Sequence, residues 1–198
     1  DVRGEALRQI ATGWKQEPGI LELLKQRVVS DESEDVRGEA LRQIATGWKQ
    51  EPGILELLKQ RVVFDESEDV RGEALRQITT GWKQEPGILE LLKQRVVFDE
   101  SSVVRSEIVE QIATGWKQEP GIFEIFYDNV LNDPFERKNK YEINPRKTAL
   151  EAIVKKYLDH PQTLPLLQDR AENDLDEQLQ KWAKKKLQQY TTEPSKRY

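Results

Sequence analysis

The sequence predicts an all-α protein, a right-handed α-solenoid of about 5.5 helical hairpins. A 34-residue unit is repeated almost without change, with copies that start at residues 1, 35 and 69. Within each unit, apolar residues recur every four positions, which is the spacing of one helix face. A proline and two glycines interrupt that periodicity in the middle of each unit. Two short helices cannot bury their apolar faces alone, so neighbouring units are expected to stack on one another.

In the central unit, residues 35–68, the first helix is predicted over residues 34–49. Its apolar face consists of Val36, Ala40, Leu41, Ile44 and Trp48. The residues before it, Ser33, Glu34 and Asp35, offer N-cap oxygens and negative charge at the positive end of the helix dipole.

The turn that follows has the sequence GWKQEPG. Pro52 is expected to open the second helix, which runs to about Val63, because proline is tolerated at the first helical position. Gly47 is either a C-cap or a point of close approach between helices, and the second reading is favoured. The lysine of this turn is expected to be solvated. The tryptophans are expected to pack in the core at one equivalent position of four units, namely at Trp14, Trp48, Trp82 and Trp116.

The later units diverge, but their spacing is still recognisable. A fourth unit starts near Val103, a fifth near residue 144 and a sixth near residue 178. Between the fourth and fifth units, residues 132–143 are predicted to form an irregular loop. The sequence thus predicts one repeat domain over residues 1–190, followed by a frayed tail over residues 191–198.

The composition excludes several kinds of site. There is no cysteine and only one histidine, His160, so no familiar metal-ligand or nucleophile set can be assembled. No glycine-rich phosphate loop or calcium loop is present. We therefore expect no catalytic, cofactor or metal site and no enzymatic activity. There is no membrane-length apolar run and no signal peptide, and we expect a cytoplasmic protein.

The spacing of aspartate and arginine resembles that of HEAT repeats, whose second helix has an aspartate six residues before an arginine. Here the pairs are Asp31 and Arg37, Asp65 and Arg71, and Asp99 and Arg105. The resemblance implies that these residues form a structural ladder between repeats. Independently, Arg37 falls on the apolar side of its helix, where an unpaired charge would be costly. The tetratricopeptide repeat has the same period, but its W-x2-L-G-x2-Y pattern is absent.

The segments ATGWKQEPG and NPRKTALEAIVKKYLDHPQTLPLLQDRAEND resemble the C-terminal repeat region of bacterial NACHT-type signal-transduction NTPases. That resemblance implies an NTPase domain upstream and a sensor or autoinhibitory role for the repeats. The chain opens at Asp1 within a repeat, so we expect it to be a C-terminal fragment of a larger protein.

The candidate interaction face is the polar side of the first helices, which the HEAT resemblance places on a concave surface. Its residues are Glu39, Arg42, Thr46, Glu73, Arg76, Thr80, Glu107 and Glu110. We expect a non-catalytic scaffold with a protein or peptide partner. Net charge of −5 argues against general nucleic-acid binding, and no membrane partner is expected. Nucleic-acid binding through Arg8, Arg42, Arg76 and the basic C-terminus is one alternative, and self-association through an exposed N-terminal repeat end is another.

Overall fold

The computed structural model describes residues 2–192, and over these residues the chain forms eleven helices and no strands. The prediction of an all-α array is confirmed. None of the described helices is long and apolar enough to cross a bilayer. The helices are α1 (Val2–Gly13), α2 (Ile20–Ser30), α3 (Glu34–Gly47), α4 (Ile54–Phe64), α5 (Glu68–Gly81), α6 (Ile88–Phe98), α7 (Ser102–Gly115), α8 (Ile122–Asn132), α9 (Pro145–Lys156), α10 (Thr163–Asn173) and α11 (Glu177–Thr192).

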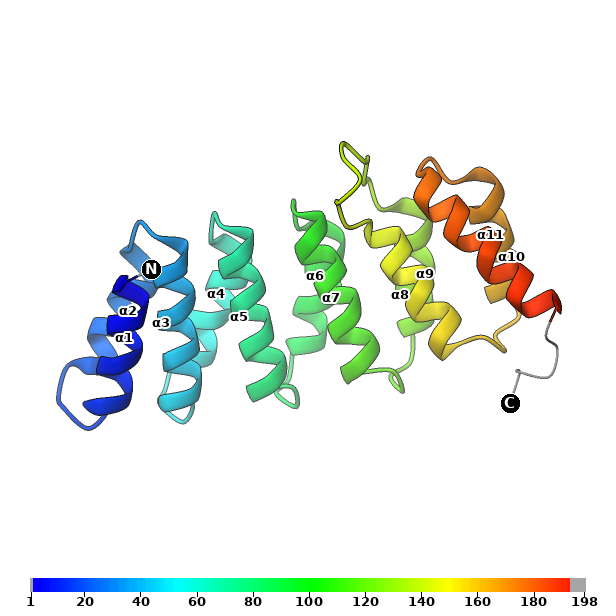
Figure 1. Cartoon of the computed structure of the whole chain (residues 1–198). Coiled ribbons are helices and arrows are strands. Elements are labelled where there is room, and N and C mark those ends of the chain that lie inside the picture. Colours follow the sequence, from blue (N-terminus) through cyan, green and yellow to red (C-terminus); the bar gives the residue numbers. More distant parts are fainter. Residues whose placement is uncertain (1, 193–198) are drawn as a thin grey trace. The chain divides into compact units, whose positions relative to one another are not determined.

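The chain divides into two compact units, Asp1–Arg95 and Val96–Tyr198. In the first unit, α3 packs between α1 and α5, so the first helices of three repeats lie side by side (Figure 1). Helix α2 packs against α3, and α4 packs against α5. Each second helix therefore joins its own repeat to the next one, which is how repeats without a shared central core are stabilised.

The second unit follows the same scheme around a longer connection. Helix α7 packs beside α9, α8 packs against α9, and α10 packs against α11. Between α8 and α9 the chain takes an irregular path over residues 133–144. This is the segment in which the sequence adds residues to the repeat.

The turn within each hairpin differs from the prediction that proline opens the second helix. Helix α3 ends at Gly47, Trp48 is its C-cap, and α4 begins only at Ile54. The backbone N–H of Glu51 donates to the carbonyl of Trp48 at 3.0 Å, which closes a tight turn before Pro52. Gly53 then adopts a φ of 84°, a left-handed conformation that glycine reaches at little cost. Glycine, and not Pro52, sets the start of the second helix.

The tryptophans are covered by lysines of the preceding repeat. The ammonium of Lys15 lies 5.7 Å from the ring centroid of Trp48, and that of Lys49 lies 5.5 Å from the ring of Trp82. Gly47 is the last residue of α3 and not its C-cap, and a Cβ atom added to it would lie 3.6 Å from Cε of Lys15, an ordinary van der Waals distance. The packing therefore does not require a glycine at this position. Lys15 and Lys49 are exposed, as expected, and their ammonium groups also lie over the tryptophan ring of the next repeat.

The tryptophans of the four repeats differ in burial. Trp82 and Trp116 are buried, and Trp48 is partly buried. Trp14 is 56% exposed, so its predicted place in the core is wrong. It lies in the turn between α1 and α2.

Candidate functional site

Buried arginine–aspartate pairs connect the repeats of the first unit. The Arg37 guanidinium donates to Oδ1 of Asp65 at 3.0 Å and to the backbone carbonyl of Asp31 at 2.9 Å. Arg71 repeats the second contact with the carbonyl of Asp65 at 2.9 Å. Arg37 and Asp65 are both buried, so their charges compensate each other away from water. The more exposed Arg3 lies 3.4 Å from Asp31.

The aspartate of each pair also fixes its own turn. Oδ1 of Asp65 accepts the backbone N–H of Ser67 at 3.1 Å, and Oδ1 of Asp99 accepts that of Ser101 at 3.0 Å. A single carboxylate therefore stabilises the bend between two helices and, at Asp65, holds the arginine of the preceding first helix. The side chain of Ser33, expected to cap α3, makes no such bond, whereas Ser101 caps α7.

The second unit contains two further pairs that the sequence analysis did not identify. Arg105 binds the Asp133 carboxylate through two contacts of 2.7 and 2.9 Å, and Arg146 binds that of Asp174 through contacts of 3.1 and 2.9 Å. In both pairs the aspartate follows the arginine by 28 residues, as Asp65 follows Arg37. That spacing was the available signal. The inserted loop obscured the other spacing, from aspartate to the next arginine, because Arg146 follows Asp133 by thirteen residues instead of six.

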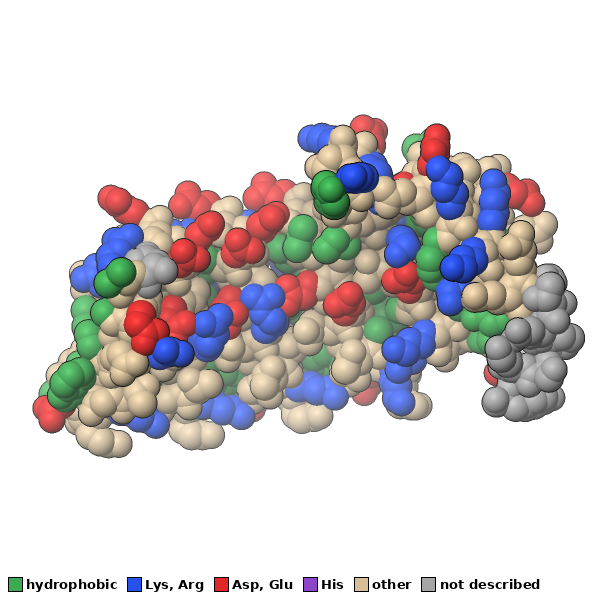
Figure 2. All heavy atoms as spheres, in the orientation of Figure 1, with side chains coloured by type: hydrophobic (Ala, Val, Ile, Leu, Met, Phe, Trp, Pro, Cys, Tyr) green, Lys and Arg blue, Asp and Glu red, His purple; other side chains and the backbone are tan. Residues whose placement is uncertain are grey.

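The polar side of the first helices in the first unit is hollowed into a groove of about 490 Å³, which we call the acidic groove. Figure 2 shows acidic and basic side chains gathered on this face over α1, α3 and α5. The lining residues come from three successive repeats: Gly4, Glu5, Arg8, Glu34, Asp35, Gly38, Glu39, Arg42, Asp69, Glu73 and Arg76.

The arginines of the acidic groove are already engaged with glutamates. Arg42 contacts Glu39 at 2.5 Å and Glu73 at 3.0 Å, and Arg76 contacts Glu73 at 3.1 Å. Arg8 pairs with Glu5 in the first repeat. Arg42 thus bridges α3 and α5 through Glu73, whereas Arg8 pairs within α1.

Glu73 lies at the centre of this chain and is only 6% exposed. Burial by itself would raise the pKa of its carboxyl group. Hydrogen bonds from Arg42, Gln77 and Arg76 outweigh that effect, so the pKa of Glu73 lies below its ordinary value. The carboxylate is therefore held in its charged form.

Carboxylates remain in excess in the acidic groove. Six acidic side chains and three arginines line it. Asp35 and Asp69 are exposed and have no ion-pair partner among the described residues. At Gly38 an added Cβ would meet no other atom within 4 Å, so the groove is open at that point. The groove thus presents uncompensated negative charge around an open space.

The predicted face is only partly brought together. Glu39, Arg42, Glu73 and Arg76 line the acidic groove, but Thr46 and Thr80 lie outside it. The hydroxyl of Thr46 donates to the carbonyl of Arg42 at 2.7 Å. The remaining residues of the face, Glu107 and Glu110, belong to the second unit. Asp35 and Asp69 also line the groove, and the sequence gives no sign of this because acidic residues at the start of a helix are equally explained by capping.

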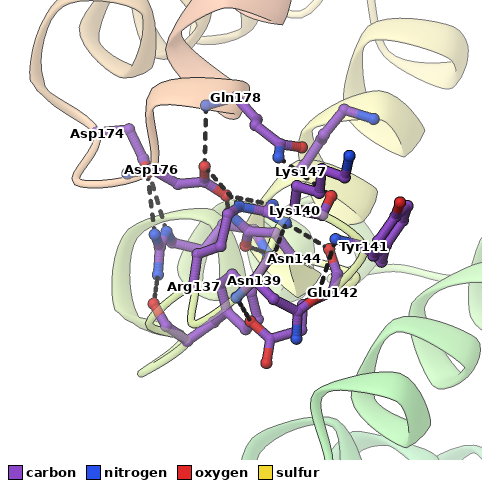
Figure 3. Close-up of polar contacts among 12 residues, drawn as sticks. Arg137, Asn139, Lys140, Tyr141, Glu142, Asn144, Lys147, Asp174, Asp176 and Gln178 are labelled. Atoms are coloured by element: carbon purple, nitrogen blue, oxygen red, sulfur yellow. Dashed lines mark hydrogen bonds and ion pairs between the residues drawn. The ribbon is translucent and has the colours of Figure 1, made fainter.

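A second polar cluster forms where the loop 133–144 meets the start of α11 (Figure 3). Arg137 reaches the Asp176 carboxylate through two contacts of 3.0 and 2.6 Å, and Asn144 donates to the same carboxylate at 2.7 Å. Burial alone would raise the pKa of Asp176. Hydrogen bonds from Arg137, Asn144 and the backbone N–H of Gln178 lower it instead, from 3.8 to about 2.

The loop is also ordered from within. The Glu142 carboxylate accepts the backbone N–H groups of Lys138 at 2.5 Å and Asn139 at 3.0 Å. The side chain of Gln178 donates to the carbonyl of Lys140 at 3.2 Å, which ties the loop to α11. The sequence predicted only that this segment is irregular, because its partners lie more than 30 residues away.

The single histidine belongs to an aromatic cluster. The ring centroid of His160 lies 3.6 Å from that of Phe123, which also contacts Tyr157 edge to face. Among residues 2–192, no group of histidine and acidic side chains has an arrangement that could hold a metal ion.

The comparisons with known proteins agree with this architecture. Residues 20–113 match the family model for HEAT repeats. That stretch extends from α2 to the end of α7 and supports a HEAT-like repeat array of the kind that the helix packing shows. No curated protein and no solved structure matches the sequence.

The buried ladder should be more important for stability than the ion pairs of the acidic groove. Replacing Arg37 by methionine leaves the buried Asp65 carboxylate without its guanidinium and should lower the free energy of unfolding by about 3 kcal/mol. The matched change Arg8→Met removes an exposed guanidinium whose partner Glu5 is exposed as well, so it should cost much less. Urea unfolding followed by circular dichroism measures both, and equal losses would contradict the assignment.

The Asp176 contacts should make the loop sensitive to acid. The pKa of Asp176 is depressed in the folded chain, so its contribution to stability is present above pH 3.8 and is lost as the pH falls towards 2. Urea unfolding midpoints measured between pH 5 and pH 2 should therefore fall more for the unchanged protein than for Asp176→Asn. Parallel pH curves for the two proteins would refute this role.

Proposed function

We propose that the chain is a non-catalytic protein-interaction scaffold that binds a basic polypeptide segment in the acidic groove. HEAT repeats commonly serve as protein-interaction scaffolds, and the match over residues 20–113 supports that general role here. The observation that carries the proposal is the excess of carboxylates in the groove, since its three arginines are paired already. Lysine or arginine side chains of a partner would meet Asp35 and Asp69 without displacing an existing ion pair.

The dimensions of the groove suit an extended segment. It crosses the three first helices α1, α3 and α5. Packed helices lie about 8–10 Å apart, so the groove spans about 20 Å. An extended chain advances about 3.3 Å per residue, so a segment of about six residues would cross the groove. About every third residue of that segment would be basic, to match the spacing of the helices.

The same geometry disfavours the nucleic-acid alternative. A DNA or RNA backbone needs free cations, and Arg8, Arg42 and Arg76 are bound to glutamates. The surplus carboxylates of the groove would repel phosphates. The last two basic residues of the chain, Lys196 and Arg197, lie outside the described residues.

The resemblance to NACHT-type NTPases supports a finer form of the proposal, in which the array is the sensor or regulatory arm of a larger NTPase. Binding of the basic segment would then alter hydrolysis by that enzyme. Removing the array from such a parent protein should change its hydrolysis rate, and an unchanged rate would leave only the scaffold role.

The test uses a fluorescent peptide with three lysines, each separated by two glycines. Fluorescence anisotropy should show binding at low salt. The change Asp35→Asn combined with Asp69→Asn should weaken it about tenfold, as expected for the loss of two exposed charge pairs. Gly38→Gln, which fills the open space of the groove, should weaken it without loss of stability.

A matched control removes the same charge elsewhere. Glu22 and Glu56 are exposed on the second helices α2 and α4 and lie outside the groove. Replacing both by glutamine should leave the affinity nearly unchanged. Equal losses in the two double variants, or tighter binding of oligothymidylate than of the peptide, would rule out the proposal. Displacement of the peptide by unlabelled chain would indicate self-association instead.

A further inference from the structure

We propose that the loop 133–144 and the start of α11 form a second docking site, which takes an acidic polypeptide segment that carries an aromatic or aliphatic side chain. The site is a groove of about 630 Å³ within the second unit, and we call it the loop groove. It shares no residue with the acidic groove, so the two proposals stand or fall separately. Its lining includes Arg137, Lys138, Lys140, Leu175, Glu177 and Lys181.

The loop groove is ordered before any partner binds. Arg137 joins the loop to Asp176 and also donates to the carbonyl of Glu142 at 2.6 Å. The Glu142 carboxylate in turn holds the backbone of Lys138 and Asn139. Figure 3 shows these side chains converging on one cluster between the loop and α11. Because the loop is fixed by its own contacts, a ligand would not have to order it, and binding would lose less conformational entropy.

Two lysines of the groove are available for a ligand. Lys138 and Lys140 are exposed, and neither ammonium has an acidic partner among the described residues. Lys140 lies 4.9 Å from the ring centroid of Tyr141, which supports its position at the edge of the groove. By contrast, Arg137 is occupied by Asp176, and Lys181 pairs with Glu177 at 3.1 Å. The charge left for a ligand is therefore positive on balance, because Glu177 is paired with Lys181, although Glu136 lines the groove and Glu142 interacts with Lys138.

Apolar side chains stand exposed beside these lysines. Leu175 lines the groove and is 90% exposed, and Tyr141 in the loop is 81% exposed. Ile143 is exposed as well. An exposed apolar side chain beside uncompensated charges, as at Leu175, is typical of a recognition surface, in which one apolar anchor and its charged neighbours fix the partner.

A polypeptide fits this chemistry better than a nucleic acid. Both arginines of the groove are used internally, since Arg146 binds Asp174 and the carbonyls of Asp133 and Phe135. A phosphate backbone would find only the two lysines and would leave the exposed Leu175 without an apolar partner. A short acidic segment can place its charges at the lysines and its apolar side chain against Leu175.

The test is selection of a random twelve-residue peptide display library on the full chain. Selected peptides should combine at least two acidic residues with a neighbouring aromatic or aliphatic residue. In fluorescence anisotropy, the change Lys138→Gln with Lys140→Gln should weaken their binding about fivefold, and Leu175→Ser should weaken it further. Replacing acids of the peptide by amides should have a similar effect.

The control variant is Lys184→Gln with Lys185→Gln, which removes the same charge from α11 outside the groove. It should leave the affinity unchanged. Circular dichroism and urea unfolding of each variant establish that losses do not arise from unfolding. No enrichment, peptides without acids, equal effects of both lysine pairs, or tighter binding of oligothymidylate or anionic vesicles would each overturn the proposal.

Discussion

The array depends on the buried contact between an arginine of one first helix and the aspartate 28 residues further along, at the end of its hairpin. Each of these aspartates fixes its own turn and compensates the arginine, as Asp65 does for Arg37. Apolar packing alone would allow a helix to slide along its neighbour, because the hydrophobic effect has no preferred direction. A buried ion pair has a defined geometry, so we attribute the register between repeats to it.

That constraint also explains how the chain tolerates an insertion. The loop 133–144 enlarges one repeat, yet Arg105 still meets Asp133 and Arg146 still meets Asp174. Arg146 even uses the carbonyls of Asp133 and Phe135, so the start of the loop becomes part of the ladder. The added residues do not disturb the arginine–aspartate pairs. These added residues are therefore available to form new contacts.

The two grooves differ in charge because their arginines have different partners. In the acidic groove, glutamates of the first helices engage every arginine and further carboxylates remain. In the loop groove, buried aspartates engage the arginines and two lysines remain. The acidic groove arises from repetition of the sequence, because its residues recur from one 34-residue repeat to the next. The loop groove arises from divergence, because it forms around residues 133–144, where the sequence interrupts the period.

The sequence by itself determined the helical hairpins, their period and the HEAT-like class, because apolar spacing and turn residues act locally. Pro52 was misjudged because the left-handed conformation of Gly53 has no signature that distinguishes it from a helical start. Trp14 was misjudged because burial depends on the repeat that packs over it. Only the tertiary structure decided which residues Arg137 binds and which charges, such as those of Asp35 and Lys138, stay uncompensated. The reason is that charge compensation depends on which distant side chains meet.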